Sequence, residues 1–204
     1  MHRQIGLKRR QIGLKSRIAG LVVAAAAVAG VACGNFTGVP ASLATITDTG
    51  TVFAINGAPL GAPTAIHAFA GAFVPADADF LFDVAFDLDS LARIHILPQR
   101  QVAAGLQPTH TVSLATVPDS FDAVGAVPSG LTFHPDTGMI IARNQVVIAQ
   151  VTDAQACGFS VTGTTLYAKI VVNAINRVDR TMSVKFTVDP NCGFRSFAPG
   201  VPKD

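Results

Sequence analysis

Large apolar residues alternate with polar ones along most of the chain after residue 43. The clearest run is Asp79–Asp89, where every even-numbered position is apolar and most odd-numbered positions are acidic. Neighbouring side chains of a strand point to opposite faces, so this run predicts a strand between core and solvent. The core face comprises Phe80, Phe82, Val84, Phe86 and Leu88, and the solvated face carries Asp79, Asp83, Asp87 and Asp89.

Shorter runs of the same kind predict more strands, separated by Gly, Pro and Asp residues that favour turns. Two pairs of runs flank such turn residues and predict hairpins about Thr49-Gly50 and about Pro135–Gly138. The runs are Ala44–Asp48 with Thr51–Asn56, Arg93–Leu97, His110–Val117, Leu131–His134 with Met139–Ala142, and Gln145–Val151.

The last two apolar runs predict a hairpin whose register can be derived. Their apolar positions are all even-numbered: Leu166, Ala168, Ile170 and Val172 in one strand, and Met182, Val184, Phe186 and Val188 in the other. Two residues that lie opposite each other in the hairpin point to the same face, so both numbers in each apolar pair are even and their sum is even. The number of residues between two such partners is then odd, and the loop must have an odd number of residues. A three-residue loop, Arg177–Asp179 with Asp179 in the left-handed conformation, satisfies this condition.

Composition agrees with a fold built from strands. All 13 acidic residues are Asp, which favours turns and caps, and Glu, a good helix former, does not occur. The chain also contains 18 Gly and 12 Pro. Residues 43–204 therefore predict a single β domain, an antiparallel β-sandwich, with a small β-barrel as the alternative.

The first 33 residues form a different kind of segment. Six basic residues lie within residues 1–17, and Ile18–Cys33 is apolar and uncharged. A basic start followed by a short apolar stretch is typical of a secretory signal peptide, and 16 residues are few for a membrane-spanning helix. We expect residues 1–32 to be the signal peptide and residues 33–42 to be a tether.

Gly30-Val31-Ala32-Cys33 resembles the lipobox of bacterial lipoprotein precursors, although that family usually has a bulky aliphatic residue where Gly30 stands. The resemblance covers residues 1–33 only. It implies that Cys33 becomes a lipid-modified N-terminus held at a membrane surface, in a bacterial cell envelope, either periplasmic or at the outer surface. Cleavage after Ala29 or Ala32 by an ordinary signal peptidase, and an uncleaved anchor, are the alternatives.

Removing the signal peptide changes the charge of the chain. Six of the 15 basic residues precede Cys33, so nine remain against 13 acidic residues and the formal charge is near −4. No cluster of Lys or Arg remains to follow a phosphate backbone, which argues against a nucleic-acid partner. With Cys33 modified, Cys157 and Cys192 remain as a pair, and an oxidising compartment predicts a disulfide between them rather than a metal or redox site.

Few residues suggest a metal-binding or catalytic site. Asp79, Asp83, Asp87 and Asp89 could supply oxygen ligands to Ca²⁺, but residues two apart on a strand are roughly 6–7 Å apart, far for one ion. Four strand histidines lack the spacing of a zinc site, and no serine lies in a nucleophile motif. The histidines are His67, His95, His110 and His134.

These observations predict a non-enzymatic structural or interaction module of the envelope, with an unidentified protein partner and a membrane contact through the lipid. A calcium-dependent adhesion or ligand-binding module is the first alternative. An unrecognised hydrolase is the second, and it would require His and Asp side chains that converge in a pocket.

Overall fold

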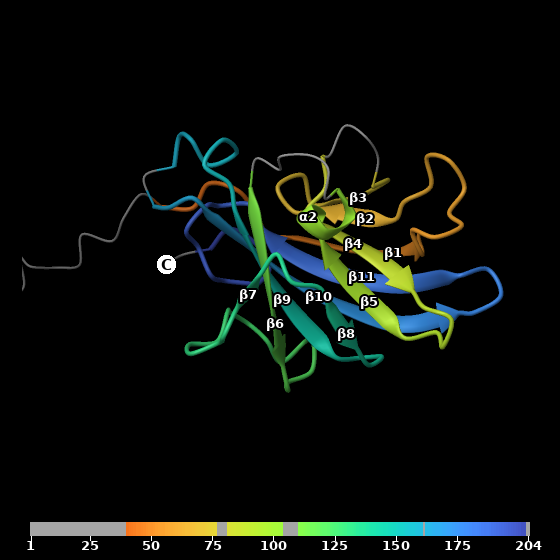
Figure 1. Ribbon diagram of the computed structural model, residues 1–204. Helices are drawn as coiled ribbons and strands as arrows, with labels where there is room; N and C mark the ends of the chain where they lie inside the picture. Colours follow the sequence, from red (N-terminus) through yellow and green to blue (C-terminus); the bar gives the residue numbers. More distant parts are fainter. Residues whose placement is uncertain (1–39, 77–80, 104–109, 161, 203–204) are drawn as a thin grey trace, which may run out of the picture. The chain divides into compact units, whose positions relative to one another are not determined.

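The computed structural model describes residues 40–76, 81–103, 110–160 and 162–202. Asp79 lies outside these ranges, as do the signal peptide and Cys33. The described strands form two antiparallel sheets, shown in Figure 1. No helix in these ranges has the length and apolar character needed to cross a bilayer.

The first sheet has six strands in the order β1-β11-β10-β9-β6-β7. The second has five, in the order β3-β2-β4-β5-β8. The first comprises β1 (Ile46–Phe53), β11 (Thr181–Asp189), β10 (Thr165–Asn176), β9 (Val146–Thr152), β6 (Thr111–Val117) and β7 (His134–Pro135). The second comprises β3 (Ala72–Val74), β2 (Ala65–His67), β4 (Val84–Leu88), β5 (Ile94–Pro98) and β8 (Met139–Ile141), and the four-residue helix α2 (Gln99–Val102) follows β5.

The main core lies between the two sheets. It combines the even-numbered residues of β4 with those of β10 and β11, and Phe86 and Phe186 are both fully buried in it. Phe73 packs edge-on against Phe186, with 5.0 Å between ring centroids. The prediction of an antiparallel β-sandwich is confirmed.

The strand predicted at Asp79–Asp89 is shorter in the structure and is buried on both faces at its start. Val84, Phe86 and Leu88 face the main core as predicted. Phe82, predicted on the same face, instead packs in a separate cluster with Ala85 of the other face and with Val102, and Phe80 lies outside the described residues. The prediction of a solvated acidic face is wrong for Asp83, which is only 3% exposed. Asp83 immediately precedes the strand, where side chains from both sheets surround it.

The hairpin predicted about Thr49-Gly50 is wrong, because both residues lie inside the continuous strand β1. All of β1 pairs with β11, from Ile46 opposite Val188 to Phe53 opposite Thr181. Gly50 is needed for close packing rather than for a turn, since a Cβ there would come within 2.6 Å of the Phe73 ring.

The hairpin predicted about Pro135–Gly138 is also wrong. His134 and Pro135 pair with β6 in the first sheet, whereas Met139–Ile141 pair with β5 in the second. The segment therefore crosses between the sheets. Asp136 adopts the positive φ of 46° that we expected at Gly138.

The last hairpin has the predicted register in its core half and a different loop. Val172 lies opposite Val184, an even sum, but a bulge after Val172 shifts the later pairs so that Asn176 lies opposite Thr181. The loop consequently has four residues, and the left-handed residue is Arg180, with φ 51°, instead of Asp179. The bulge inserts one residue into β10, and this reverses the parity on which the three-residue prediction depended.

A second apolar cluster covers part of the outer face of the six-stranded sheet. Residues of the loop after β6 and of the C-terminal segment pack there on β9 and β10. They include Phe121 and Val124 of the loop, Phe197 of the C-terminal segment, and Ile148 and Val171 of the sheet. The outer face of β1 and β11 lies beyond this cluster.

Candidate functional site

Cys157 and Cys192 form the predicted disulfide. The sulfur atoms are 2.02 Å apart and the Cα atoms 5.9 Å apart, within the usual range for a bridge. Both residues are buried. The bond joins the loop after β9 to the segment after β11, at one end of the sandwich.

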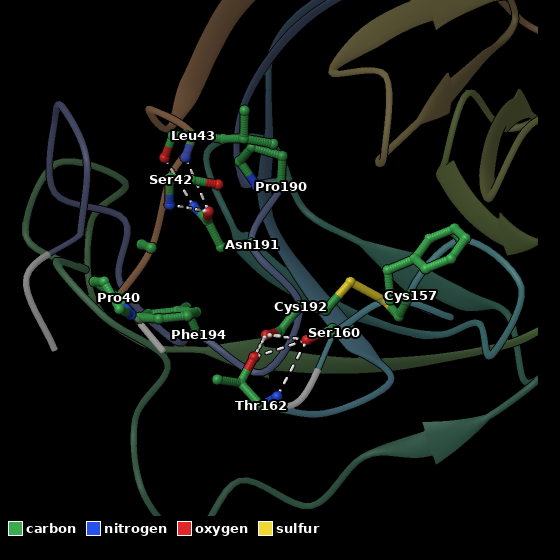
Figure 2. A pocket seen from close by; sticks show the side chains of 13 residues that line it. Pro40, Ser42, Leu43, Cys157, Ser160, Thr162, Pro190, Asn191, Cys192 and Phe194 are labelled. Carbon is green, nitrogen blue, oxygen red and sulfur yellow. Dashed lines mark hydrogen bonds between the residues drawn. A yellow bond between two sulfur atoms is a disulfide. The ribbon is translucent and has the colours of Figure 1, made fainter. Parts of the chain in front are cut away.

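A hollow of about 480 Å³ adjoins this bridge (Figure 2). Asn191, in the lining of this hollow, hydrogen-bonds to the start of the described chain. The Asn191 Oδ1 atom accepts hydrogen bonds of 3.0 Å from the backbone N–H groups of Ser42 and Leu43, and its Nδ2 atom donates to the Leu43 carbonyl. The predicted tether therefore reaches the sandwich at Ser42, next to the disulfide.

The described members of the acidic series contact separate sets of partners. Asp87 accepts hydrogen bonds from Asn56 and from Arg180, whose Nη2 atom is 3.2 Å from Asp87 Oδ1. Arg180 also donates to the Leu88 carbonyl. These contacts join the loop of the last hairpin to the second sheet, at the end opposite the disulfide.

Asp89 closes the turn between β4 and β5. The backbone N–H of Arg93 donates to its carboxylate, and this bond, with those from the Arg93 and His95 side chains, holds the pKa of Asp89 below its usual range despite the opposing effect of burial. Within the described ranges, no three His, Cys or Asp side chains gather as a metal-binding group. Calcium binding by this stretch stays a prediction.

His110 and Asp83 meet between the two sheets, although they are 27 positions apart in the sequence. The His110 Nε2 atom is 2.9 Å from Asp83 Oδ1, and Nδ1 is 3.9 Å from Asp153 Oδ2. The His110 side chain is 7% exposed. The backbone N–H of Ala68 donates to the other Asp83 oxygen. The cluster therefore combines residues directly after β2, directly before β4 and β6, and in the loop after β9.

Opposing effects determine the protonation of His110. Burial lowers the pKa of the imidazole, but the hydrogen bond and charge of Asp83, with the charges of Asp153 and Asp136, outweigh it and raise the pKa above the ordinary value of 6.5. A protonated imidazole donates from both ring nitrogens, and both face carboxylate oxygens here. At pH values below this raised pKa, the cluster is a buried ion group that links the sheets.

A cavity of about 290 Å³ opens beside the cluster, with His67, Phe69 and Leu81 in its lining. His and Asp thus converge in a pocket, as the hydrolase hypothesis required. A general base, however, needs a free nitrogen lone pair, and this imidazole directs both nitrogens at carboxylates. No Ser, Thr or Cys is among the described lining residues to serve as a nucleophile. This cluster gives the hydrolase hypothesis no support.

No family model matches the sequence, and neither the curated proteins nor the solved structures contain a match. The function must therefore be argued from the residues alone.

Proposed function

We propose that the chain is a lipid-anchored β-sandwich of a bacterial cell envelope that acts as a non-enzymatic structural or interaction module. The Cys157–Cys192 disulfide is the observation that carries the proposal. Disulfides persist in exported proteins and are rare in the reducing cytosol. The pairing also leaves Cys33 as the third cysteine, in the position that the resemblance to lipoprotein precursors assigns to the lipid.

The disulfide also suits a small domain outside the cell. It closes a loop across 35 positions of sequence, which on the chain-entropy model stabilises the folded state by about 4 kcal/mol. Both cysteines are buried, which limits exchange with external thiols.

The attachment of Ser42 sets the distance between the proposed lipid and the sandwich. Ser42 lies nine positions after Cys33, and an extended chain spans at most about 3.5 Å per residue. The Asn191 contacts at Ser42 and Leu43 would therefore keep the disulfide end within about 30 Å of the membrane surface. A partner of this module would be a protein at or near that surface.

Intact-mass analysis of the full chain expressed in a bacterium tests the anchor. We expect a product that begins at Cys33, carries diacylglycerol and fractionates with membranes until detergent is added. Cys33→Ser should abolish the lipid mass and the membrane retention. The double variant Cys157→Ser/Cys192→Ser is the matched control, and it should keep the lipid while it loses stability. A soluble cytoplasmic product with residues 1–32 still attached would refute the proposal.

Cross-linking in intact cells tests the interaction role. We expect the wild-type chain to cross-link to a protein of the same membrane, and Cys33→Ser, which is no longer held there, to lose that product. A chain that is lipidated but yields only monomer would leave the anchor standing and refute the interaction role.

A further inference from the structure

A cavity of about 630 Å³ lies on the outer face of the six-stranded sheet, where the second apolar cluster ends. Strands β1, β10 and β11 form its floor, and residues 121–125 and 197–200 form its walls. A volume of this size suits a small organic molecule. None of the sites described above includes this cavity.

One row of side chains across the sheet explains why the cavity has a polar floor. Thr47 of β1 lies opposite Thr187 of β11, which lies opposite Lys169 of β10, which lies opposite Ile148 of β9. Ile148 belongs to the covered apolar cluster, whereas the two threonines and the lysine line the cavity. The row therefore changes from apolar to polar at Lys169.

Lys169 is a buried cation with an incomplete set of partners. The residue is 5% exposed. Its ammonium nitrogen donates to the carbonyl oxygens of Phe121 and Val124, both at 2.8 Å, and lies 4.3 Å from the centroid of the Phe121 ring. An ammonium has three N–H donors, and the third has no acceptor among the described residues.

No carboxylate in the described chain forms an ion pair with Lys169. The nearby Asp122 instead pairs with Lys185, at 3.0 Å, and its side chain is 87% exposed. Burial lowers the pKa of Lys169, the charge of Asp122 opposes this effect, and the charge of Lys185 adds to it. Lysine is rarely buried without a counter-ion, because carbonyl dipoles compensate only part of the lost hydration.

The threonine pair supplies a second donor to the cavity. The Thr47 and Thr187 hydroxyl oxygens are 2.8 Å apart, so one hydroxyl donates to the other. The remaining hydroxyl proton is then available to a ligand, because neither oxygen has another hydrogen bond within the described residues. This proton and the spare N–H of Lys169 belong to neighbouring residues of one row.

We propose that this cavity binds a small organic carboxylate, whose oxygens accept hydrogen bonds from Lys169 and from the Thr47–Thr187 pair. Lys185 and Asp122 of the lining offset one another as an ion pair, so Lys169 leaves the lining with a net charge of +1, which matches a monoanion. Phe121, Phe197 and Pro199 offer apolar walls to the rest of the molecule. The cavity is also larger than an inorganic anion requires.

Calorimetric titration of the full chain in detergent with benzoate tests the proposal, with benzyl alcohol as the neutral probe and inorganic phosphate as the mineral anion. We expect saturable benzoate binding in the millimolar range or tighter, and at least tenfold weaker binding of the other two. A charge-assisted hydrogen bond contributes about 1.5–3 kcal/mol, so Lys169→Met should weaken benzoate binding at least tenfold. Lys185→Met, which removes a cation already paired with Asp122, should weaken it less than threefold.

Two further measurements keep the test decisive if Lys169→Met fails to fold. Thr47→Val keeps the shape of an exposed side chain, so this variant should fold. It removes one hydroxyl of the Thr47–Thr187 pair and should weaken benzoate binding severalfold. Benzoate affinity of the wild-type chain should also fall as the pH rises through the lowered pKa of Lys169, because only the ammonium attracts the carboxylate. Absence of benzoate binding, equal binding of benzyl alcohol, preference for phosphate, or unchanged affinity in Lys169→Met would each overturn the proposal.

Discussion

The fold buries two cationic side chains in different ways. His110 lies between the sheets with carboxylates facing both of its ring nitrogens, whereas Lys169 lies on an outer face with backbone carbonyls and aromatic rings as partners. The His110 group contains its own counter-charges and links elements of the sandwich. The Lys169 group lacks a counter-charge and lines a cavity. The comparison separates a buried charge that stabilises the fold from one that marks a binding site.

The largest effect is expected when the His110 group loses its principal counter-ion. Asp83→Asn retains an acceptor for the Ala68 N–H but leaves the imidazolium with only the more distant carboxylates of Asp153 and Asp136. Breaking a buried ion pair costs about 3–5 kcal/mol, and we expect about 3 kcal/mol here. Urea denaturation at pH 6 measures the change in the free energy of unfolding.

Asp122→Asn is the matched control for that change, because it removes a carboxylate from an exposed ion pair. It should cost less than about 1 kcal/mol. Equal losses in the two variants would mean that His110 does not depend on Asp83.

A smaller effect is expected from pH, because deprotonation of His110 leaves Asp83 and its hydrogen bond to Ala68 in place. The pKa of His110 is higher in the folded state than the ordinary value of 6.5, so the folded state binds this proton more tightly. The resulting stabilisation is complete below pH 6.5 and is lost as the pH rises through the folded pKa. Thermal unfolding across this window should show a falling midpoint temperature, and His110→Gln should flatten that dependence.

Asp189 extends the comparison to a buried anion. It is fully buried, and among the described residues its Oδ2 atom has no hydrogen-bond partner. Burial raises the pKa of Asp189, although hydrogen bonds from Asn191 oppose the rise. The ionised carboxylate therefore destabilises the fold as the pH rises from about 3.9 through the folded pKa. Asp189→Asn keeps an acceptor for Asn191 and should raise stability at pH 7 by about 1 kcal/mol, measured by urea denaturation.

The smallest effect on stability is expected at Lys169. Lys169→Met loses two hydrogen bonds to carbonyls but also removes the cost of burying an unpaired cation, so we expect a net change within about 1 kcal/mol. Urea denaturation without ligand measures this change. A loss above about 3 kcal/mol would show that the lysine stabilises the fold as strongly as Asp83 does.

Local patterns were sufficient to predict the faces of the strands. The even-numbered residues of β4, β10 and β11 face one core as predicted, because period-two alternation depends only on the backbone of each strand. The disulfide followed from the count of cysteines and the expected compartment. The loop of the last hairpin did not follow, because the bulge after Val172 reflects the bending of a long strand in the sheet and leaves no mark in the alternation.

Contacts between distant segments were beyond such reasoning. The pairing of β1 with β11 joins segments more than 120 residues apart, so Thr49-Gly50 appeared to be a local turn. In the sequence, Asp83 has the same pattern as Asp87 and Asp89, and no nearby residue indicates that it contacts His110. Lys169 occupies an odd-numbered position of β10, which the alternation assigns to the outer face. Only the loop that covers that face shows that the residue is buried.

The Asn191 contacts also determine how the sandwich would respond to mechanical load. Tension on the residues before Ser42 would enter the body through Asn191, which precedes the covalently bridged Cys192. The load would then divide between Cys192, which the sulfur–sulfur bond links to the loop after β9, and the backbone that continues from Leu43 into β1 and its pairing with β11. Arg180 and its contact with Asp87 lie at the far end of β11 from Cys192, so the length of that strand separates them from the point where the load enters.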